Sequence, residues 1–133
     1  MGPGVVDDVA KQFQAQRRQC AFPQFPGGFS FFHETPILRG DGAGIHTVDM
    51  ADYKAYTALS FRTDGIDMVE RAKTGNVPAA IGKLPRLVLA QGGVLIKAGD
   101  EIVGVIGVSG ARGNNIDTQC ARAAVDKIKD QLK

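Results

Sequence analysis

The chain has 133 residues, which is enough for one domain with its own buried core, and we expect a single domain over residues 1–133. Its 16 basic and 14 acidic side chains are scattered, so no basic stripe indicates a nucleic-acid partner. No apolar stretch approaches the roughly 20 residues that cross a bilayer, and the start of the chain lacks the pattern of a secretion signal. We therefore expect a cytoplasmic protein without a membrane partner.

The first third of the chain predicts one helix and one hairpin. Apolar residues recur at helical spacing over residues 5–20, and Pro23 lies just beyond the expected end of that helix. An aromatic run at residues 29–33 is typical of a strand, and residues 37–39 are expected to be its hairpin partner. A glycine-rich loop follows at residues 40–44, where several positions can adopt positive φ.

The middle of the chain predicts two further helices. The first covers residues 48–61, with Thr47 or Asp49 as its N-cap, and small residues on one face would let it lie close to a sheet. A second, shorter helix is expected at residues 65–74. Residues 76–85 contain two prolines and a glycine and are expected to form a loop.

The last third carries the strongest pattern. A glycine pair, Gly92 and Gly93, precedes a strand, a tight turn at residues 97–100 and a second strand at residues 101–108, which predicts a hairpin. The closing helix should begin at Asn114 or Asn115 as cap. Its apolar residues repeat every four positions: Ile116, Cys120, Ala124, Ile128 and Leu132.

Two consequences follow from this order of elements. Strands joined by hairpins, with no helix between them, favour an antiparallel sheet. The strand at residues 101–108 is apolar or glycine on both faces after Glu101, so we expect helices on one face and a second copy of the protein on the other. The sequence thus predicts a homo-oligomer, a dimer or larger.

Cys20 and Cys120 are expected to be reduced, with a disulfide or a metal pair as the alternative.

Three segments, in this order, carry a family resemblance. Residues 39–43 match an Arg-x-Asp-Gly-Ala loop, and residues 51–58 match an Ala-x-x-Lys-Ala-x-Thr-Ala helix. The glycine pair, residues 104–111, and then Asp117 complete the pattern. On these motifs the chain resembles the GlcG/HbpS-like family, also called the haem-degrading domain, which includes the C-terminal domain of PduO-type corrinoid adenosyltransferases.

The resemblance implies an α/β (α+β) architecture with a profilin-like fold. In this fold an antiparallel sheet of about five strands is flanked by helices, the N- and C-terminal helices included, and subunits assemble into dimers or larger oligomers. The resemblance also implies binding of haem or a corrinoid as a small-molecule ligand. The first hairpin departs from the family, because residues 29–34 are short and follow an unusual Phe-Pro-Gln-Phe-Pro run.

Haem binding requires an axial ligand for the iron, an apolar slot and partners for the propionates. The only two histidines, His33 and His46, are therefore the candidate axial ligands, with an ordinary surface or hydrogen-bonded histidine as the alternative for each. Cationic side chains are expected to bind carboxylate or phosphate groups, although internal salt bridges are an alternative. The loop from Ser109 opens a helix and offers either an anion site or a tight turn. The candidate ligand-binding residues are Arg39, Asp41, Lys54, Gly92, Gly93 and Ser109.

Three functions remain open at this stage. The first is a binding protein for haem or a related tetrapyrrole, lined by Arg39, the glycine pair and a histidine. The second is an accessory or assembly protein encoded beside a glycolate or diol metabolic enzyme, without catalysis. The third is an enzyme acting on a small acid or on haem, with activity that depends on Arg39 or Lys54.

Overall fold

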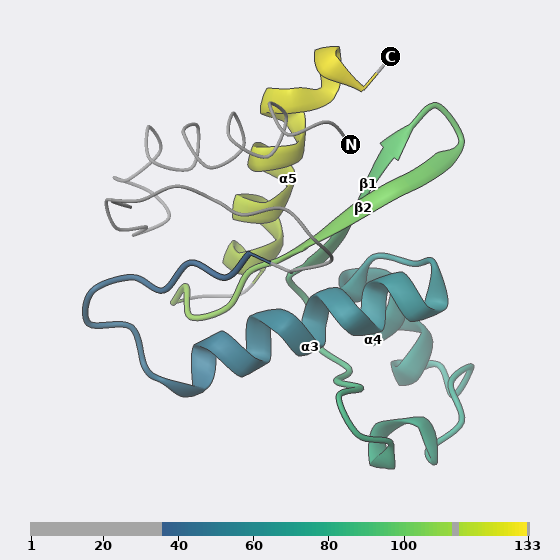
Figure 1. Ribbon diagram of the computed structural model, residues 1–133. Helices are drawn as coiled ribbons and strands as arrows, with labels where there is room; N and C mark the ends of the chain where they lie inside the picture. Colours follow the sequence, from purple (N-terminus) through teal and green to yellow (C-terminus); the bar gives the residue numbers. More distant parts are fainter. Residues whose placement is uncertain (1–35, 113–114, 133) are drawn as a thin grey trace.

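The structure is a computed structural model that describes residues 36–112 and 115–132. This part of the chain is a mixed helix-and-sheet unit with three α-helices and one two-stranded antiparallel sheet. The predicted helix at residues 5–20 and strand at residues 29–33 lie outside the described residues. The elements, shown in Figure 1, are α3 (His46–Phe61), α4 (Gly65–Lys73), η1 (Ile81–Lys83), β1 (Gly93–Ala98), β2 (Glu101–Gly107), α5 (Ile116–Ile128) and η2 (Lys129–Gln131).

Helix α3 confirms the predicted helix but begins two residues earlier, at His46. The predicted caps are wrong. The N-cap is Ile45, which makes no side-chain capping bond, and the Thr47 hydroxyl donates to the Gly44 carbonyl at 2.6 Å from inside the first turn. The helix ends at Phe61, and its C-cap, Arg62, adopts a left-handed conformation with φ of 51°. Its amide N–H donates to carbonyl groups of the last turn, as helix ends commonly require.

Helix α4 follows directly and is also confirmed. Its N-cap, Asp64, makes no capping bond to the helix; instead its Oδ1 accepts the N–H of Leu95 at 2.9 Å. This bond joins the start of α4 to β1. Gly65 lies so close to the chain before β1 that a Cβ there would be 2.5 Å from the Ala90 carbonyl oxygen. The predicted loop at residues 76–85 contains the short 3-10 helix η1.

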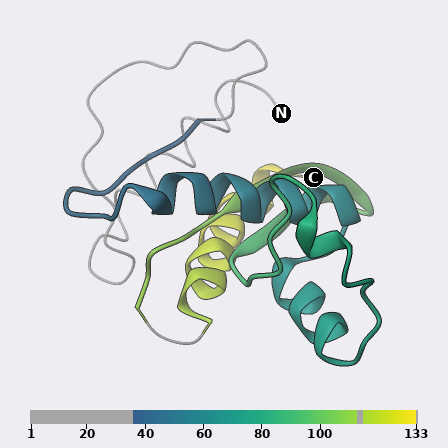
Figure 2. The same ribbon diagram turned by 90° about the horizontal axis from the view of Figure 1, so that it is seen from below.

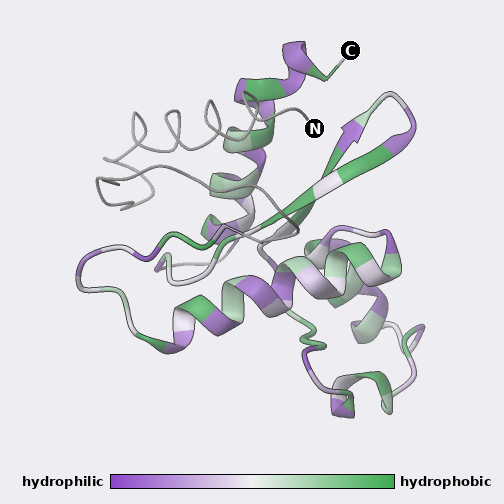
Figure 3. Cartoon of the chain, viewed as in Figure 1, coloured by the Kyte–Doolittle hydropathy of each residue, from purple (hydrophilic) through white to green (hydrophobic). Residues whose placement is uncertain are grey.

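The predicted hairpin is confirmed as β1 and β2. Gly93 pairs with Gly107 and Ala98 with Glu101, and the register shifts between Ile96 and Lys97 at a β-bulge. Figure 3 shows hydrophobic residues along most of both strands and hydrophilic ones near the turn. Residues 36–40 form no strand, so the expected hairpin partner at residues 37–39 is wrong. The described residues contain two strands, and the five-strand count remains a prediction.

Helix α3 lies against one face of the hairpin because two glycines are paired there. A Cβ on Gly93 would collide with the carbonyl group of Lys54, and one on Gly107 would collide with that of Ala51. Side chains on the helix are small at the same contact, with Ala55 and Ala58 buried. Backbone therefore meets backbone, and the helix is held closer to the sheet than larger residues would permit.

Helix α5 covers the opposite face of β1, as Figures 1 and 2 show together. Its predicted apolar stripe is confirmed, since Cys120, Ala124 and Ile128 are buried. The stripe packs on Val94 and Ile96 in two clusters of buried hydrophobic residues. Full burial of an aliphatic side chain of this size stabilises a fold by about 1.5–3 kcal/mol.

The start of α5 confirms Asn115, one of the two predicted caps, by position. Asn115 is the N-cap but has φ of 61° and makes no side-chain capping bond, and Asn114 lies outside the described residues. Cys20 also lies outside them, so only Cys120, which is buried, can be placed.

Residues 102–107 of β2 are half-buried, and the predicted sister subunit on that strand remains a prediction. Within the described part of the chain, no helix is long and apolar enough to span a membrane.

Candidate functional site

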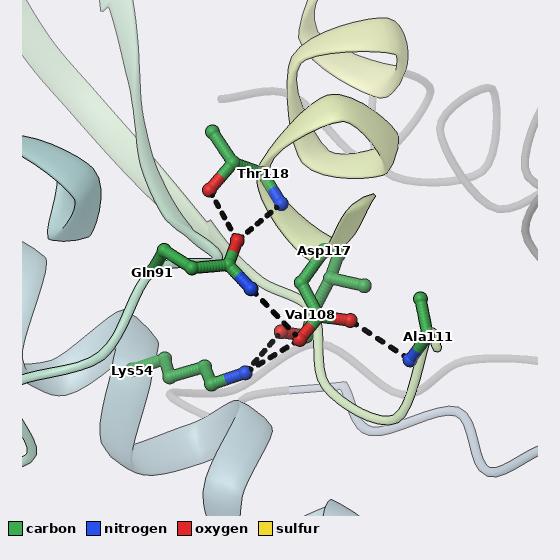
Figure 4. A network of polar contacts seen from close by, with 6 residues as sticks. All are labelled: Lys54, Gln91, Val108, Ala111, Asp117 and Thr118. Atoms are coloured by element: carbon green, nitrogen blue, oxygen red, sulfur yellow. Dashed lines mark hydrogen bonds and ion pairs between the residues drawn. The ribbon is translucent and has the colours of Figure 1, made fainter. Parts of the chain in front are cut away.

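A buried ion pair joins the two helices that sandwich the hairpin. The Lys54 Nζ lies 2.8 Å from the Asp117 Oδ2, and the two side chains are only 6% and 7% exposed. Lys54 comes from α3 on one face of the sheet, and Asp117 comes from the first turn of α5 on the other. The ammonium group also donates to the Val108 carbonyl at 3.1 Å, just beyond the end of β2 (Figure 4).

Asp117 also accepts hydrogen bonds from two other residues. Its Oδ1 accepts the N–H of Ala111 at 2.9 Å, and its Oδ2 lies 3.4 Å from the Gln91 Nε2. Gln91 in turn accepts two bonds from Thr118 through its Oε1, from the backbone N–H at 2.9 Å and from the hydroxyl at 2.6 Å. Figure 4 shows these groups converging at the first turn of α5. Burying charges is tolerated when they are paired and hydrogen-bonded in this way.

Gly92 makes room for this network. It has φ of 114°, a conformation that L side chains rarely adopt. A Cβ at Gly92 would lie 2.5 Å from the Val108 carbonyl oxygen, 3.0 Å from the Asp117 Cβ and 3.2 Å from the Lys54 Cδ. The missing side chain therefore leaves the passage through which Lys54 reaches from one helical layer to the other.

The structure brings together three of the predicted ligand-binding residues, Lys54, Gly92 and Gly93, and all three are buried. Ser109 is half-buried and follows Val108, which accepts the lysine bond. The loop that opens α5 was expected to offer its amides either to an anion or to a tight turn. Its Ala111 N–H binds the Asp117 carboxylate, so the anion at this loop belongs to the chain itself.

The other predicted residues lie in the loop before α3. Arg39, Asp41 and His46 are exposed. The Arg39 Nη1 donates to the Ala43 carbonyl at 2.6 Å, which closes the loop on itself. Within the described residues Arg39 forms a loop bond of this kind rather than a salt bridge with Asp41. His33 lies outside the described residues.

This loop meets the loop after β2. A Cβ on Gly110 would lie 3.1 Å from the Thr47 Cγ2, so Ser109 and Gly110 lie beside the start of α3, next to His46. Two large apolar side chains are exposed in the same segment: Ile45 at 81% and Ile37 at 47%. An imidazole, a guanidinium and exposed aliphatic side chains thus occur within one short segment at the surface.

Sequence reasoning missed Gln91, Thr118 and the role of Asp117. Asp117 belongs to the motif that carries the family resemblance, and this was the available signal. Gln91 directly precedes the glycine pair, but nothing in the sequence marks it as the partner of a helix start. Among the described residues, no group of three or more His, Cys, Asp or Glu side chains is placed to hold a metal ion.

On the outer face of α3, Arg86 lies over the Tyr56 ring at 4.2 Å and pairs with Asp52 at 2.9 Å. The hydrogen bond to Asp52 is the main cause that raises the pKa of the Arg86 guanidinium above its usual value. Arg86 therefore remains charged at every physiological pH. Arg86 and Tyr56 are exposed and Asp52 is half-buried, and this cluster makes none of the bonds of the buried network.

Comparisons with known proteins find a family model and solved structures that this chain resembles. The model of the family described as "Haem degrading protein HbpS-like" matches residues 32–126. A crystal structure of HbpS is 32% identical, with a TM-score of 0.60, and the match covers 67% of this chain and 61% of that one. A double mutant of HbpS from Streptomyces reticuli is 35% identical, with a TM-score of 0.59, covering 67% and 59%. The match thus spans less than two thirds of both HbpS chains.

A third structure extends the fold comparison. The Klebsiella pneumoniae protein ORFY, from the family DUF336, is 16% identical with a TM-score of 0.74, and the match covers 96% of this chain and 89% of that one. At this identity the likeness concerns the fold, and it fits an α+β architecture. A search of curated proteins gave no significant match.

Proposed function

The chain belongs to the HbpS-like family, and from this membership we propose that it is a small-molecule-binding protein that holds haem or a related tetrapyrrole or corrinoid and assembles as a homo-oligomer. The family match over residues 32–126 carries the proposal. Because the two HbpS structures are longer than the matched region, the ligand and the assembly are proposed for this chain from its own residues as well.

The segment from Ile37 to Thr47 supports the proposal. A tetrapyrrole requires an apolar surface for the ring, and Ile45 and Ile37 offer exposed aliphatic side chains there. Iron requires a ligand such as an imidazole, and the His46 side chain is exposed. Propionates require donors, and the Arg39 guanidinium has N–H groups beyond the one bonded to Ala43. His33 remains the second candidate axial ligand.

The buried members of the predicted set have a different role in this proposal. Lys54, Gly92 and Gly93 do not contact the ligand; they hold the loop from Ser109 against the start of α3. Lys54 does so through the Val108 carbonyl, one residue before Ser109. The site is thus a surface loop supported by a rigid, buried base, a common arrangement for binding residues.

A haemin titration tests the ligand. The wild-type protein, at micromolar concentration, is expected to produce a Soret band that saturates, and His46→Ala is expected to shift or abolish it. His33→Ala tests the second histidine, and Asp126→Ala, an exposed change on α5, is the matched control. A wild-type protein that gives no Soret band at micromolar haemin would remove haem from the proposal.

Size-exclusion chromatography with light scattering tests the assembly. The half-buried residues of β2 favour a dimer or a larger oligomer, and a stable monomer at micromolar concentration would contradict this part of the proposal. Accessory and catalytic roles stay predictions. Turnover that is lost in Arg39→Ala would favour the catalytic one. A cytoplasmic location also stays a prediction.

A further inference from the structure

An open depression of about 400 Å³ lies at the edge of β1 that carries no partner strand among the described residues. It lies between the end of α3, the start of α4 and the side of α5. The Leu95 N–H points to this edge and is bound by Asp64. The polar and charged residues that line the depression include Arg62, Asp64, Asp67, Arg71 and Lys97.

Three cations line this depression: Arg62, Arg71 and Lys97, here called the cation rim. None of the three has an ion-pair partner within residues 36–112 and 115–132. Other cations of the same part of the chain are paired: Lys54 with Asp117 and Lys73 with Glu70. One of the two carboxylates in the depression, Asp64, is engaged by the Leu95 amide and lies 3.7 Å from Arg122. The lining is thus left with an excess of unneutralised positive charge.

Two backbone irregularities occur at or beside members of the cation rim. Arg62 occupies a left-handed position with φ of 51°, where glycine is the residue without a steric penalty and other residues cost roughly 1 kcal/mol. Lys97 lies directly after the register shift, where its partner is Ile102 and the extra residue of the β-bulge, Val103, belongs to β2; such bulges are enriched beside binding sites. A non-glycine residue at a strained position on a rim of like charges is an outlier of the kind found at ligand sites.

We propose that the cation rim binds a small anion with at least two negative charges, a polycarboxylate or an organic phosphate. Guanidinium groups form paired hydrogen bonds with both kinds of group, and Lys97 adds a point charge. Asp67, exposed and without an ion-pair partner among the described residues, supplies an acceptor for a hydroxyl or ammonium group of the ligand. The proposed haem segment lies at the start of α3, and Arg62 of the cation rim follows its end. A helix of 16 residues, about 24 Å long, therefore separates the two sites.

Isothermal titration calorimetry at low ionic strength tests the proposal with citrate and pyrophosphate as separate probes, which distinguishes carboxylate from phosphate. Wild type is expected to bind one of the two with one site per chain. Arg62→Gly is expected to weaken binding at least about tenfold while the unfolding midpoint stays equal or rises. Arg71→Gln and Lys97→Gln are each expected to weaken it several-fold. Lys83→Gln removes the same charge from exposed η1 and is expected to change the affinity less than twofold.

Two outcomes would overturn the proposal. One is a wild-type protein that binds neither probe at millimolar concentration. The other is an equal loss of affinity in Lys83→Gln and Arg62→Gly, because net charge rather than a site would then account for binding. The haemin Soret titration of Arg62→Gly is expected to match wild type. Failure of haem binding therefore leaves the anion measurement unaffected, and the two proposals are tested separately.

Discussion

The charged residues beside the two ends of the β1–β2 hairpin differ in burial and in pairing. At its base, around Gly92 and Val108, the Lys54–Asp117 pair is almost fully excluded from water, and both charged groups make further hydrogen bonds. Along the free edge towards the turn, the cation rim is exposed and has no ion-pair partner among the described residues. At the base, opposite charges join two helices of the fold. At the rim, the cations are free to bind an anionic ligand in the proposal above. Substitutions at the two regions should therefore separate stability from binding.

The largest effect is expected at the base. Lys54→Met leaves the Asp117 carboxylate buried without its cation, and loss of one partner of a buried pair costs about 3–5 kcal/mol. Guanidinium chloride denaturation measures this loss. Lys73→Met, which breaks the exposed pair with Glu70, is the control and should cost at most about 0.5 kcal/mol. The double variant Lys54→Met with Asp117→Leu should recover part of the loss; a fully additive loss would contradict the coupling of the two residues.

The second largest loss of stability is expected at the glycine contact under α3. Gly107→Ala places a methyl group against the Ala51 carbonyl, and overpacking of this kind costs about 3 kcal/mol. Gly82→Ala is the matched control, because a Cβ there meets nothing within 4 Å and φ is not positive. Thermal unfolding of the two variants gives the difference. Equal midpoints would show that α3 does not press on the hairpin.

A smaller loss is expected where α4 is attached to the edge of β1. Asp64→Ala removes the acceptor of the Leu95 N–H, and because this bond is only partly buried beside an open depression, its loss should cost about 1 kcal/mol. Asp64→Asn keeps an acceptor oxygen and should lose less. Amide hydrogen exchange at Leu95 is the direct measurement. Unchanged protection at Leu95 in Asp64→Ala would mean that the bond does not hold this edge.

The smallest change in the free energy of unfolding is expected at the cation rim, where a substitution should leave stability equal or raise it. Arg62→Gly relieves the left-handed strain, offset by the greater freedom of glycine in the unfolded chain, so the free energy of unfolding should rise by about 0.5 kcal/mol or remain equal. Denaturant titration beside wild type measures it. A loss larger than about 1 kcal/mol would show that the Arg62 side chain supports the fold, and the contrast between base and rim would then fail.

The helices and the hairpin could be predicted because local patterns specify them. The four-residue repeat from Ile116 predicted α5, and the glycine pair followed by an apolar run predicted β1 and β2. The helix starts were less accessible: Thr47 and Asn115 are good capping residues by type, yet neither makes a side-chain capping bond. The Thr47 hydroxyl donates to the Gly44 carbonyl instead, and Asn115 has a left-handed backbone with φ of 61°.

The candidate site could be predicted only in part. Lys54 and Asp117 are 63 positions apart in the chain, and no local pattern states that two charged residues will be buried together. The glycines that permit this pairing were recognised, but their reason is steric and appears only with the neighbours in place. Arg62 was invisible to sequence reasoning, because an arginine at a left-handed helix end contradicts the usual preference for glycine.

The facing glycines also fix how the two strands are aligned. Gly93 and Gly107 are directly paired, and both lie under the backbone of α3. Sliding one strand by a single residue would bring Val94 or Ile106 beneath the helix, where even a methyl group has no room. The close contact with α3 is therefore compatible with only one register of the hairpin. This register in turn determines the position of Val108 and of the loop that follows it.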